Sequence, residues 1–317
     1  MKLVLLGNGP FAVPLLNRIA ASEHAISLVI TRPERPSGKR REFVPGPVRA
    51  RAETLGIPVE QPESVNSAEY VERLRSEGAD VLVVADFGQI LSGDCLSSAR
   101  LGGINVHASL LPKYRGAAPV AWAVFHGETE TGVSIIQMTS SLDAGGVILQ
   151  AATPILEHET AGELEARLAD LGAALALEAL AKLESGEAQI VPQDASLATK
   201  APRLKKEDGR IQWNRAARLV QAQVRAMQPW PGAFTEWRRG AADSVRLQIF
   251  DVQVVHPSGA ADEPPGTVVK VDGEALHVAA GEGGVVAVRR LKPAGKREMD
   301  AKTFLNGYKV QAGNRFS

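Results

Sequence analysis

The stretch "ADVLVVADFGQILSGDCLSSARLGGINVHA", residues 79–108, holds two short apolar runs separated by a polar segment. The run at 79–88 predicts a strand buried on both faces, and the run at 102–108 predicts a second strand. Upstream, residues 2–7 and 25–31 predict two more strands, with helical patterns between them. This alternation predicts βαβ units and an α/β fold, a doubly wound, Rossmann-like, mostly parallel sheet.

The second half of the chain has a different pattern. Residues 131–156 predict two longer strands, which we expect to be antiparallel, and 160–186 predict a long amphipathic helix. Residues 187–206 have no clear periodicity and are typical of a linker. Short β-like runs with Gly turns between 245 and 295 predict a small OB-like β-barrel. We expect three parts: a catalytic domain at 1–187, a linker at 188–206 and a C-terminal β-barrel domain at 207–317.

Composition excludes several classes of protein. The chain has 317 residues and is 44% hydrophobic, which is ordinary for a globular protein. No apolar run is long enough to span a bilayer, and "MKLVLLGNGPF" predicts a first strand rather than a signal peptide. The single cysteine, Cys95, excludes an intrachain disulfide and a four-cysteine zinc site. We therefore expect a cytoplasmic protein without a membrane partner. The sequence does not indicate an oligomeric state, and a monomer is the simpler expectation.

The charge is unevenly distributed along the chain. Residues 1–199 hold 16 Lys and Arg against 24 Asp and Glu, whereas residues 200–317 hold 20 against 12. This asymmetry indicates that the second half meets a polyanion, although two domains can also differ in charge by chance. Residues 31–51 hold seven Lys or Arg and two Glu in a Pro- and Gly-containing setting. They predict a basic loop, which either contacts a polyanion or is merely solvated.

The segment "GNGPFA" at 7–12 matches G-x-G-x-x-A between a predicted strand and a predicted helix. That is the setting of a dinucleotide-binding turn. Arg32 stands where the fingerprint has an acid, and an Arg suits the phosphate of NADP. An NADP-dependent oxidoreductase therefore remains an alternative, as does a Gly turn that binds no nucleotide.

Candidate catalytic side chains follow the strand at 102–108. Asn105 and His107 are two residues apart, so in an extended segment they face the same side. Asp143 lies in the loop "SSLDAGG" between the next two predicted strands. Each residue alone has a structural explanation: a turn Asn, a structural His, an Asp before Gly. Together, beyond the carboxyl end of a strand in a doubly wound sheet, they favour a polar catalytic site.

A family resemblance rests on four stretches, of which one, "TRPERPSGKRREFVPGPVRARAETLGIPVEQPES" (31–64), resembles the family's basic loop and following helix. The stretch "GGINVHASLLPKYRGAAPVAWAVFHGETETGVSIIQMTSSLDAGGVI" (102–148) resembles the signature of the methionyl-tRNA formyltransferases, within the 10-formyltetrahydrofolate-dependent formyltransferase superfamily. The stretches "RIQWNRAARLVQAQVRAMQPWPGAF" (210–234) and "LKPAGKREMDAKTFLNGY" (291–308) resemble the start and the end of that family's C-terminal domain.

The resemblance implies transfer of the formyl group of 10-formyltetrahydrofolate to the amino group of methionine on initiator tRNA, in translation initiation. It implies that Asn105, His107 and Asp143 are catalytic, and no metal is needed. A side-chain amide suits a developing oxyanion, and an imidazole with a carboxylate suits proton transfer. Folate contacts are implied at Ser109, Leu110, Leu111, Pro112, Asp86, Phe87, Gly88 and Ile90. At 85–88 the chain reads Ala-Asp-Phe-Gly where the family more often has Ala-Tyr-Gly.

The resemblance also implies tRNA contacts in three basic zones. These are Lys39, Arg40, Arg41, Lys205, Lys206, Arg289, Arg290 and Lys296. Four alternatives remain beside the tRNA enzyme. They are a formyltransferase acting on a sugar nucleotide or small amine, a formyltetrahydrofolate hydrolase, the NADP-dependent oxidoreductase and a non-enzymatic tRNA-binding module.

Overall fold

The computed structural model describes residues 1–34, 44–238, 244–255 and 263–317. The chain forms two compact units. The N-terminal unit consists of Met1–Pro119, Glu130–Pro154 and Leu164–Pro202, and the C-terminal unit of Val120–Thr129, Ile155–Glu163 and Arg203–Ser317. Two short segments of the first half thus belong to the C-terminal unit. The functional boundaries at 187 and 206 stay a prediction.

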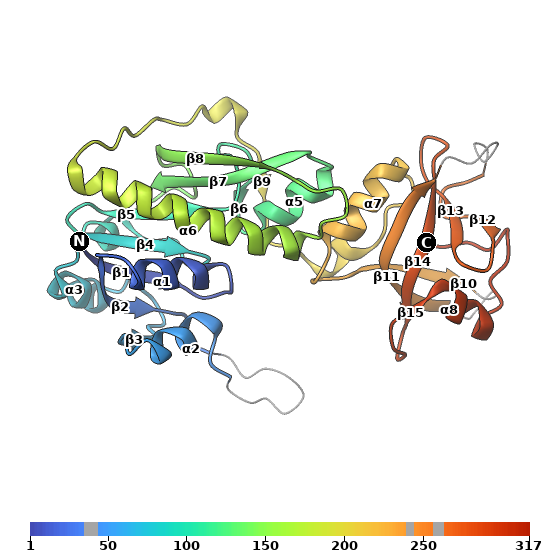
Figure 1. Cartoon of the computed structure of the whole chain (residues 1–317), viewed down its shortest axis with the longest axis horizontal. Helices are drawn as coiled ribbons and strands as arrows, with labels where there is room; N and C mark the ends of the chain where they lie inside the picture. Colours follow the sequence, from blue (N-terminus) through green and yellow to red (C-terminus); the bar gives the residue numbers. More distant parts are fainter. Residues whose placement is uncertain (35–43, 239–243, 256–262) are drawn as a thin grey trace. The chain divides into compact units, whose positions relative to one another are not determined.

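Seven strands form the sheet of the N-terminal unit in the described part of the chain (Figure 1). In spatial order they are β3 (Val59–Glu60), β2 (Ala25–Ile30), β1 (Lys2–Gly7), β4 (Val81–Ala85), β5 (Gly103–His107), β7 (Glu130–Gln137) and β8 (Val147–Pro154). The first five are parallel, and β7 and β8 are antiparallel to their neighbours. The predicted Rossmann-like, mostly parallel sheet is confirmed.

Helices complete this unit and bury the sheet. They are α1 (Ala12–Ala20), α2 (Pro47–Thr54), α3 (Ala68–Glu77), α4 (Gly93–Leu96) and α6 (Ala161–Ser185). Every residue of β4 is buried, because both faces of a central parallel strand pack against helices. Ser67 caps α3 by accepting from the Tyr70 amide, and Gly78, with φ of 62°, ends it.

Helix α6 packs directly on the strands that carry the candidate site. A Cβ atom on Gly172 would lie 2.7 Å from Cγ1 of Val106 in β5 and 3.3 Å from Val133 in β7. Only glycine permits this close approach. Because Val106 faces α6, its neighbours Asn105 and His107 face the opposite side of the sheet.

The segment expected to be a linker is attached to the N-terminal unit as far as residue 201. Val191 exchanges two backbone hydrogen bonds of 2.8 Å with Val147. After the short helix η1 (Ala195–Leu197), strand β9 (Lys200–Ala201) pairs in parallel with β6 (Arg115–Gly116). These contacts are backbone bonds at strand edges and leave no apolar period in the sequence, which is why the segment resembles a linker.

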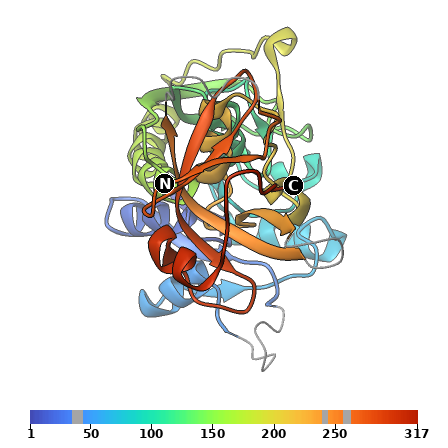
Figure 2. The same ribbon diagram turned by 90° about the vertical axis from the view of Figure 1, so that its right-hand side faces the viewer.

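The C-terminal unit is an antiparallel sheet with helices around it. Its described strands are β10 (Ala233–Arg238), β11 (Ser244–Val255), β12 (Val268–Val271), β13 (Leu276–Ala279), β14 (Val285–Pro293) and β15 (Met299–Asp300). Its helices are α5 (Pro119–His126), η2 (Lys206–Gly209), α7 (Ala217–Ala226) and α8 (Ala301–Gly307). Figure 2 shows the twisted strands of this unit facing the viewer.

Residues 313–317 connect the two edges of this sheet. The strand order places β10 at one edge and β12 at the other. Phe316 bridges to Trp237 in β10, and Arg315 bridges to Thr267 next to β12. The Val268 amide donates to the Asn314 carbonyl at 2.8 Å. Both edges are therefore covered, and the predicted barrel-like domain is confirmed as an antiparallel half-barrel.

No helix within 1–34, 44–238, 244–255 and 263–317 has both the length and the apolar character that a bilayer crossing requires.

Candidate functional site

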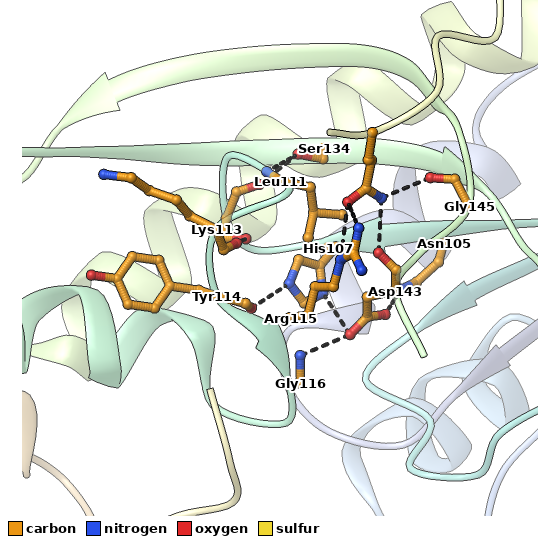
Figure 3. Close-up of polar contacts among 12 residues, drawn as sticks. Asn105, His107, Leu111, Lys113, Tyr114, Arg115, Gly116, Ser134, Asp143 and Gly145 are labelled. Atoms are coloured by element: carbon orange, nitrogen blue, oxygen red, sulfur yellow. Dashed lines mark hydrogen bonds and ion pairs between the residues drawn. The ribbon is translucent and has the colours of Figure 1, made fainter. Parts of the chain in front are cut away.

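The carboxyl end of β5 brings two of the predicted catalytic residues to one place. β5 lies between β4, which is parallel to it, and β7, which is antiparallel. Asn105 pairs with Val84 on one side and Ile136 on the other. Asp143 comes from the loop that joins β7 to β8, and Figure 3 shows its carboxylate between Asn105, His107 and Gly116.

Asp143 is held by three groups. Its Oδ1 accepts from Nδ2 of Asn105 at 3.2 Å, and its Oδ2 accepts from the backbone amide of Gly116 at 2.9 Å. Nδ1 of His107 lies 3.7 Å from Oδ2. Only 10% of the Asp143 side chain is exposed, and its backbone has a φ of 48°, which is uncommon for a residue other than glycine. The structure thus brings the three predicted residues into contact, while their catalytic role stays a prediction.

The tautomer of His107 is set by a backbone carbonyl. Nε2 lies 2.9 Å from the carbonyl oxygen of Tyr114, in a ring that is 6% exposed (Figure 3). A carbonyl oxygen only accepts, so Nε2 carries the proton. Nδ1 is consequently the nitrogen that faces Asp143. The Tyr114 carbonyl, and not Asp143, therefore holds the tautomer of His107.

The Ser-Leu-Leu-Pro turn is built around Ser134 of β7. The Ser134 hydroxyl donates to the Ser109 carbonyl at 2.6 Å and accepts from the Leu111 amide at 3.0 Å. Gln150 donates to the Ser134 hydroxyl and to the Leu111 carbonyl, at 2.8 Å each. Ser109 is fully buried and its hydroxyl donates to the Lys113 carbonyl at 2.7 Å. Its hydroxyl is engaged in holding the turn, which disfavours a serine nucleophile.

Gln193 and Arg115 lie at the site but were not predicted from the sequence. Gln193 donates through Nε2 to the carbonyls of Asp143 and Gly145, at 2.8 and 2.7 Å. Its Oε1 accepts from Arg115 at 3.1 and 2.7 Å. Gln193 lies in a segment without periodicity, 50 residues from Asp143, so no local sequence signal indicates this contact.

The segment implied in folate binding presents some side chains and buries others. Ile90 is 56% exposed although it is apolar, and Gly88 is exposed. Phe87 is only 3% exposed and belongs to the hydrophobic core, so a ligand at this place would meet its backbone rather than its ring. Within the Ser-Leu-Leu-Pro turn, Leu110 and Pro112 are half-buried and Leu111 is buried. A contact by Ile90 and by the turn backbone is compatible with this arrangement.

Asp86 occupies the turn that resembles a dinucleotide site. Its carboxylate accepts a hydrogen bond from the Gly9 backbone, and a Cβ on Gly9 would lie 1.9 Å from its Oδ2. Desolvation raises the pKa of Asp86, and desolvation together with the nearby Asp86 charge raises the pKa of Glu165. A pyrophosphate bound to "GNGPFA" would meet this carboxylate. The arrangement therefore disfavours the NADP alternative.

The predicted tRNA contacts have different surroundings. Lys39, Arg40 and Arg41 lie outside the described residues. Lys205, Lys206, Arg289, Arg290 and Lys296 are all exposed on the C-terminal unit. Arg290 forms an ion pair of 3.1 Å with Glu298, which partly neutralises it.

Two further arginines of the C-terminal unit, Arg210 and Arg246, were not named among the predicted contacts. The guanidinium carbon of Arg246 lies 3.4 Å from the ring centre of Phe234, and that of Arg210 lies 5.3 Å from it. Both residues are exposed. One aromatic ring thus holds two positive charges at the surface.

Among the described residues, the structure contains no cluster of three or more His, Cys, Asp or Glu that is suited to a metal ion.

Comparisons with known proteins assign the family. The family model described as formyl transferase matches residues 1–180, and that for the formyl transferase C-terminal domain matches 203–309. A methionyl-tRNA formyltransferase from Moorella thermoacetica is 42% identical over 313 residues, which are 99% of this chain and 98% of that protein. One from Halalkalibacterium halodurans is 40% identical over 317 residues, 100% of this chain and 96% of that protein.

Solved structures share the fold. An N-formyltransferase from Helicobacter canadensis has a TM-score of 0.64 at 16% sequence identity, covering 91% of this chain and 98% of that one. Because the two family models and the full-length relatives agree over both units, the chain belongs to the formyl transferase family, among the methionyl-tRNA formyltransferases.

Proposed function

We propose that this enzyme transfers the formyl group of 10-formyltetrahydrofolate to the amino group of methionine on initiator tRNA. The observation that carries the proposal is the contact of Asn105, His107 and Asp143 at the end of β5, in a chain with full-length methionyl-tRNA formyltransferase relatives. The solved Helicobacter canadensis relative is a complex with folinic acid, a formylated folate, which supports a folate donor.

Asn105 supplies a hydrogen-bond donor for the formyl oxygen. Its side-chain NH₂ has two hydrogens, and the Asp143 carboxylate accepts one of them. In the described part of the chain the second hydrogen has no acceptor, so it is free to meet an oxygen that becomes negative as the amine attacks. A fixed donor at this place lowers the barrier by about 3–4 kcal/mol.

His107 and Asp143 transfer the protons of the reaction. Because Nε2–H is committed to Tyr114, Nδ1 is the nitrogen that exchanges a proton at the reacting centre. Asp143 stabilises positive charge on the ring from 3.7 Å and accepts the amine proton directly or through a water. The proton then passes to the leaving nitrogen of the folate, which completes the transfer without a covalent enzyme intermediate.

Residues 86–90 and the Ser-Leu-Leu-Pro turn are proposed to hold the folate. Ile90 offers exposed apolar surface, and the backbone of 109–112 is fixed by Ser134 and Gln150. A rigid turn orients a flat polar ligand at a low entropy cost. At Asp86 this chain departs from the family pattern, and its carboxylate accepts a hydrogen bond from the Gly9 backbone.

A single assay separates the proposed function from its alternatives. Purified enzyme is mixed with 10-formyltetrahydrofolate and one acceptor at a time: methionine-charged initiator tRNA, free methionine, an amino-sugar nucleotide or water alone. We expect formyl transfer to the charged tRNA at least about 100-fold faster than to the other acceptors, because binding contacts remote from the amine contribute to catalysis. Preferred transfer to the sugar nucleotide, or release of free formate with every acceptor, would favour an alternative function instead.

The basic surface of the C-terminal unit is proposed to follow the tRNA backbone. Arg210 and Arg246 share the ring of Phe234. Lys205 lies next to η2, and Lys206 is its first residue. Guanidinium groups bind phosphates in a bidentate manner, and Phe234 keeps two of them oriented. The proposed contact set for this unit is Lys205, Lys206, Arg210, Arg246, Arg289, Arg290 and Lys296.

Replacing both Arg210 and Arg246 by Ala is expected to weaken tRNA binding at every salt concentration. Each lost phosphate contact should reduce the magnitude of the slope of log K against log [salt] by about 1. The slope of the double variant should therefore be smaller in magnitude by about 2. The measurement is a filter-binding titration of initiator tRNA between low and moderate salt. The matched control is Arg75→Ala, an exposed arginine of α3 in the N-terminal unit, which should leave the slope unchanged. An unchanged slope in the double variant would remove these two residues from the contact set.

A further inference from the structure

Gln193 connects three parts of the N-terminal unit. Its amide nitrogen donates to the carbonyls of Asp143 and Gly145, at 2.8 and 2.7 Å. Its amide oxygen accepts two hydrogen bonds from the guanidinium of Arg115, at 3.1 and 2.7 Å. Both hydrogens and both acceptor sites of one side chain are therefore used. Such complete satisfaction in a half-buried place fixes the groups on either side of the amide.

The loop around Asp143, which Gln193 contacts, has a strained and closely packed backbone. Asp143 has a positive φ of 48°, a conformation that costs about 1–2 kcal/mol for a residue with a Cβ. A Cβ on Gly145 would lie 1.7 Å from the carbonyl oxygen of Gln137, so the chain passes very close to β7 there. Without Gln193, the two loop carbonyls would lose their donor within the described structure.

The segment bound to the amide oxygen of Gln193 also contacts the Asp143 carboxylate. Arg115 precedes Gly116, whose amide donates to Oδ2 of Asp143 at 2.9 Å. Tyr114, which precedes Arg115, accepts from His107. Gln193 therefore holds the Asp143 loop on one side and the 114–116 segment on the other, and these two segments set the distance between the carboxylate and the imidazole.

From these contacts we propose that Gln193 is a positioning residue for formyl transfer, acting through Asp143. The inference rests on the proposed function of the site. Gln193 does not meet the reacting atoms; it keeps the Asp143 carboxylate at the place from which it contacts Asn105, Gly116 and His107. Its loss displaces the carboxylate rather than removing a substrate contact, so kcat changes more than KM.

The test compares Gln193→Glu and Gln193→Met with the wild-type enzyme. Glu retains an acceptor for Arg115 but turns a carboxylate towards two carbonyls, and Met removes both functions at nearly constant volume. We expect kcat to fall about 10- to 100-fold in each variant, with KM for folate and for tRNA changed by less than about threefold. The matched control is Ser196→Ala in η1, whose hydroxyl contacts only Asp194 among the described residues.

A double-variant cycle distinguishes positioning from a merely structural role. If Gln193 acts through Asp143, adding Gln193→Glu to Asp143→Asn should lower kcat by less than about threefold further. Amide hydrogen exchange of residues 138–146 should be faster in Gln193→Glu than in the Ser196→Ala control. Independent, multiplicative losses of kcat, or a Gln193→Glu enzyme that behaves like Ser196→Ala in both measurements, would overturn the proposal. A wild-type enzyme without formyl transfer contradicts the proposed function instead, and the exchange measurement still decides whether Gln193 holds the loop.

Discussion

Asn105→Asp is expected to lower kcat for formyl transfer by about 10²- to 10³-fold, the range found when one donor to a developing oxyanion is removed. Asp has nearly the volume of Asn but, when ionised, has no hydrogen to donate. Its charge would also lie about 3 Å from Oδ1 of Asp143, the atom to which Asn105 now donates. The measurement is single-turnover transfer to charged initiator tRNA with both substrates saturating.

Asn105→Ala distinguishes the effect of the lost hydrogen-bond donor from that of the added negative charge. It removes the donor without adding a charge, so a similar loss of kcat would assign the effect to the missing donor. Asn306→Ala, at an exposed position of α8, is the control and should keep wild-type kcat. A kcat within about threefold of wild type in both Asn105 variants, with folding verified by thermal unfolding, would mean that the amide does not stabilise the transition state.

Asp143→Asn is expected to lower kcat by about 10²- to 10⁴-fold, the range for loss of a positioned proton-transfer group. The amide oxygen of Asn can still accept from the Gly116 backbone, so the loop geometry should change little. What disappears is the negative charge 3.7 Å from Nδ1 of His107, together with the oxygen that now accepts from Asn105. The measurement is single-turnover transfer to charged initiator tRNA with both substrates saturating.

Two comparisons make the Asp143 result specific. Asp143→Glu keeps the charge but lengthens the side chain, so we expect a kcat between those of the wild type and of Asp143→Asn. Asp170→Asn removes an exposed carboxylate of α6 and should leave kcat unchanged. If Asp143→Asn kept the wild-type kcat, the proton would have to be accepted by another group, and the assignment of Asp143 would be wrong.

Much of the N-terminal unit was predictable because its strands carry strong local signals. The apolar run 81–85 became β4 with every residue buried, and Asn105 and His107 faced one side because side chains alternate along a strand. The prediction for the C-terminal unit was less complete. Strand β10 (Ala233–Arg238) was missed because it directly follows the Pro- and Gly-containing turn at 228–232, a pattern typical of a loop.

The sequence by itself determined the alternation of strands and helices, the family and the common face of Asn105 and His107. These depend on short periods and contiguous motifs, which are present in the order of amino acids before the chain folds. Tertiary structure alone decided that Tyr114 sets the His107 tautomer and that Gln193, 50 residues away, holds the Asp143 loop. The physical reason is that backbone carbonyls accept hydrogen bonds whatever side chain their residue bears, so such contacts leave no trace in the order of amino acids.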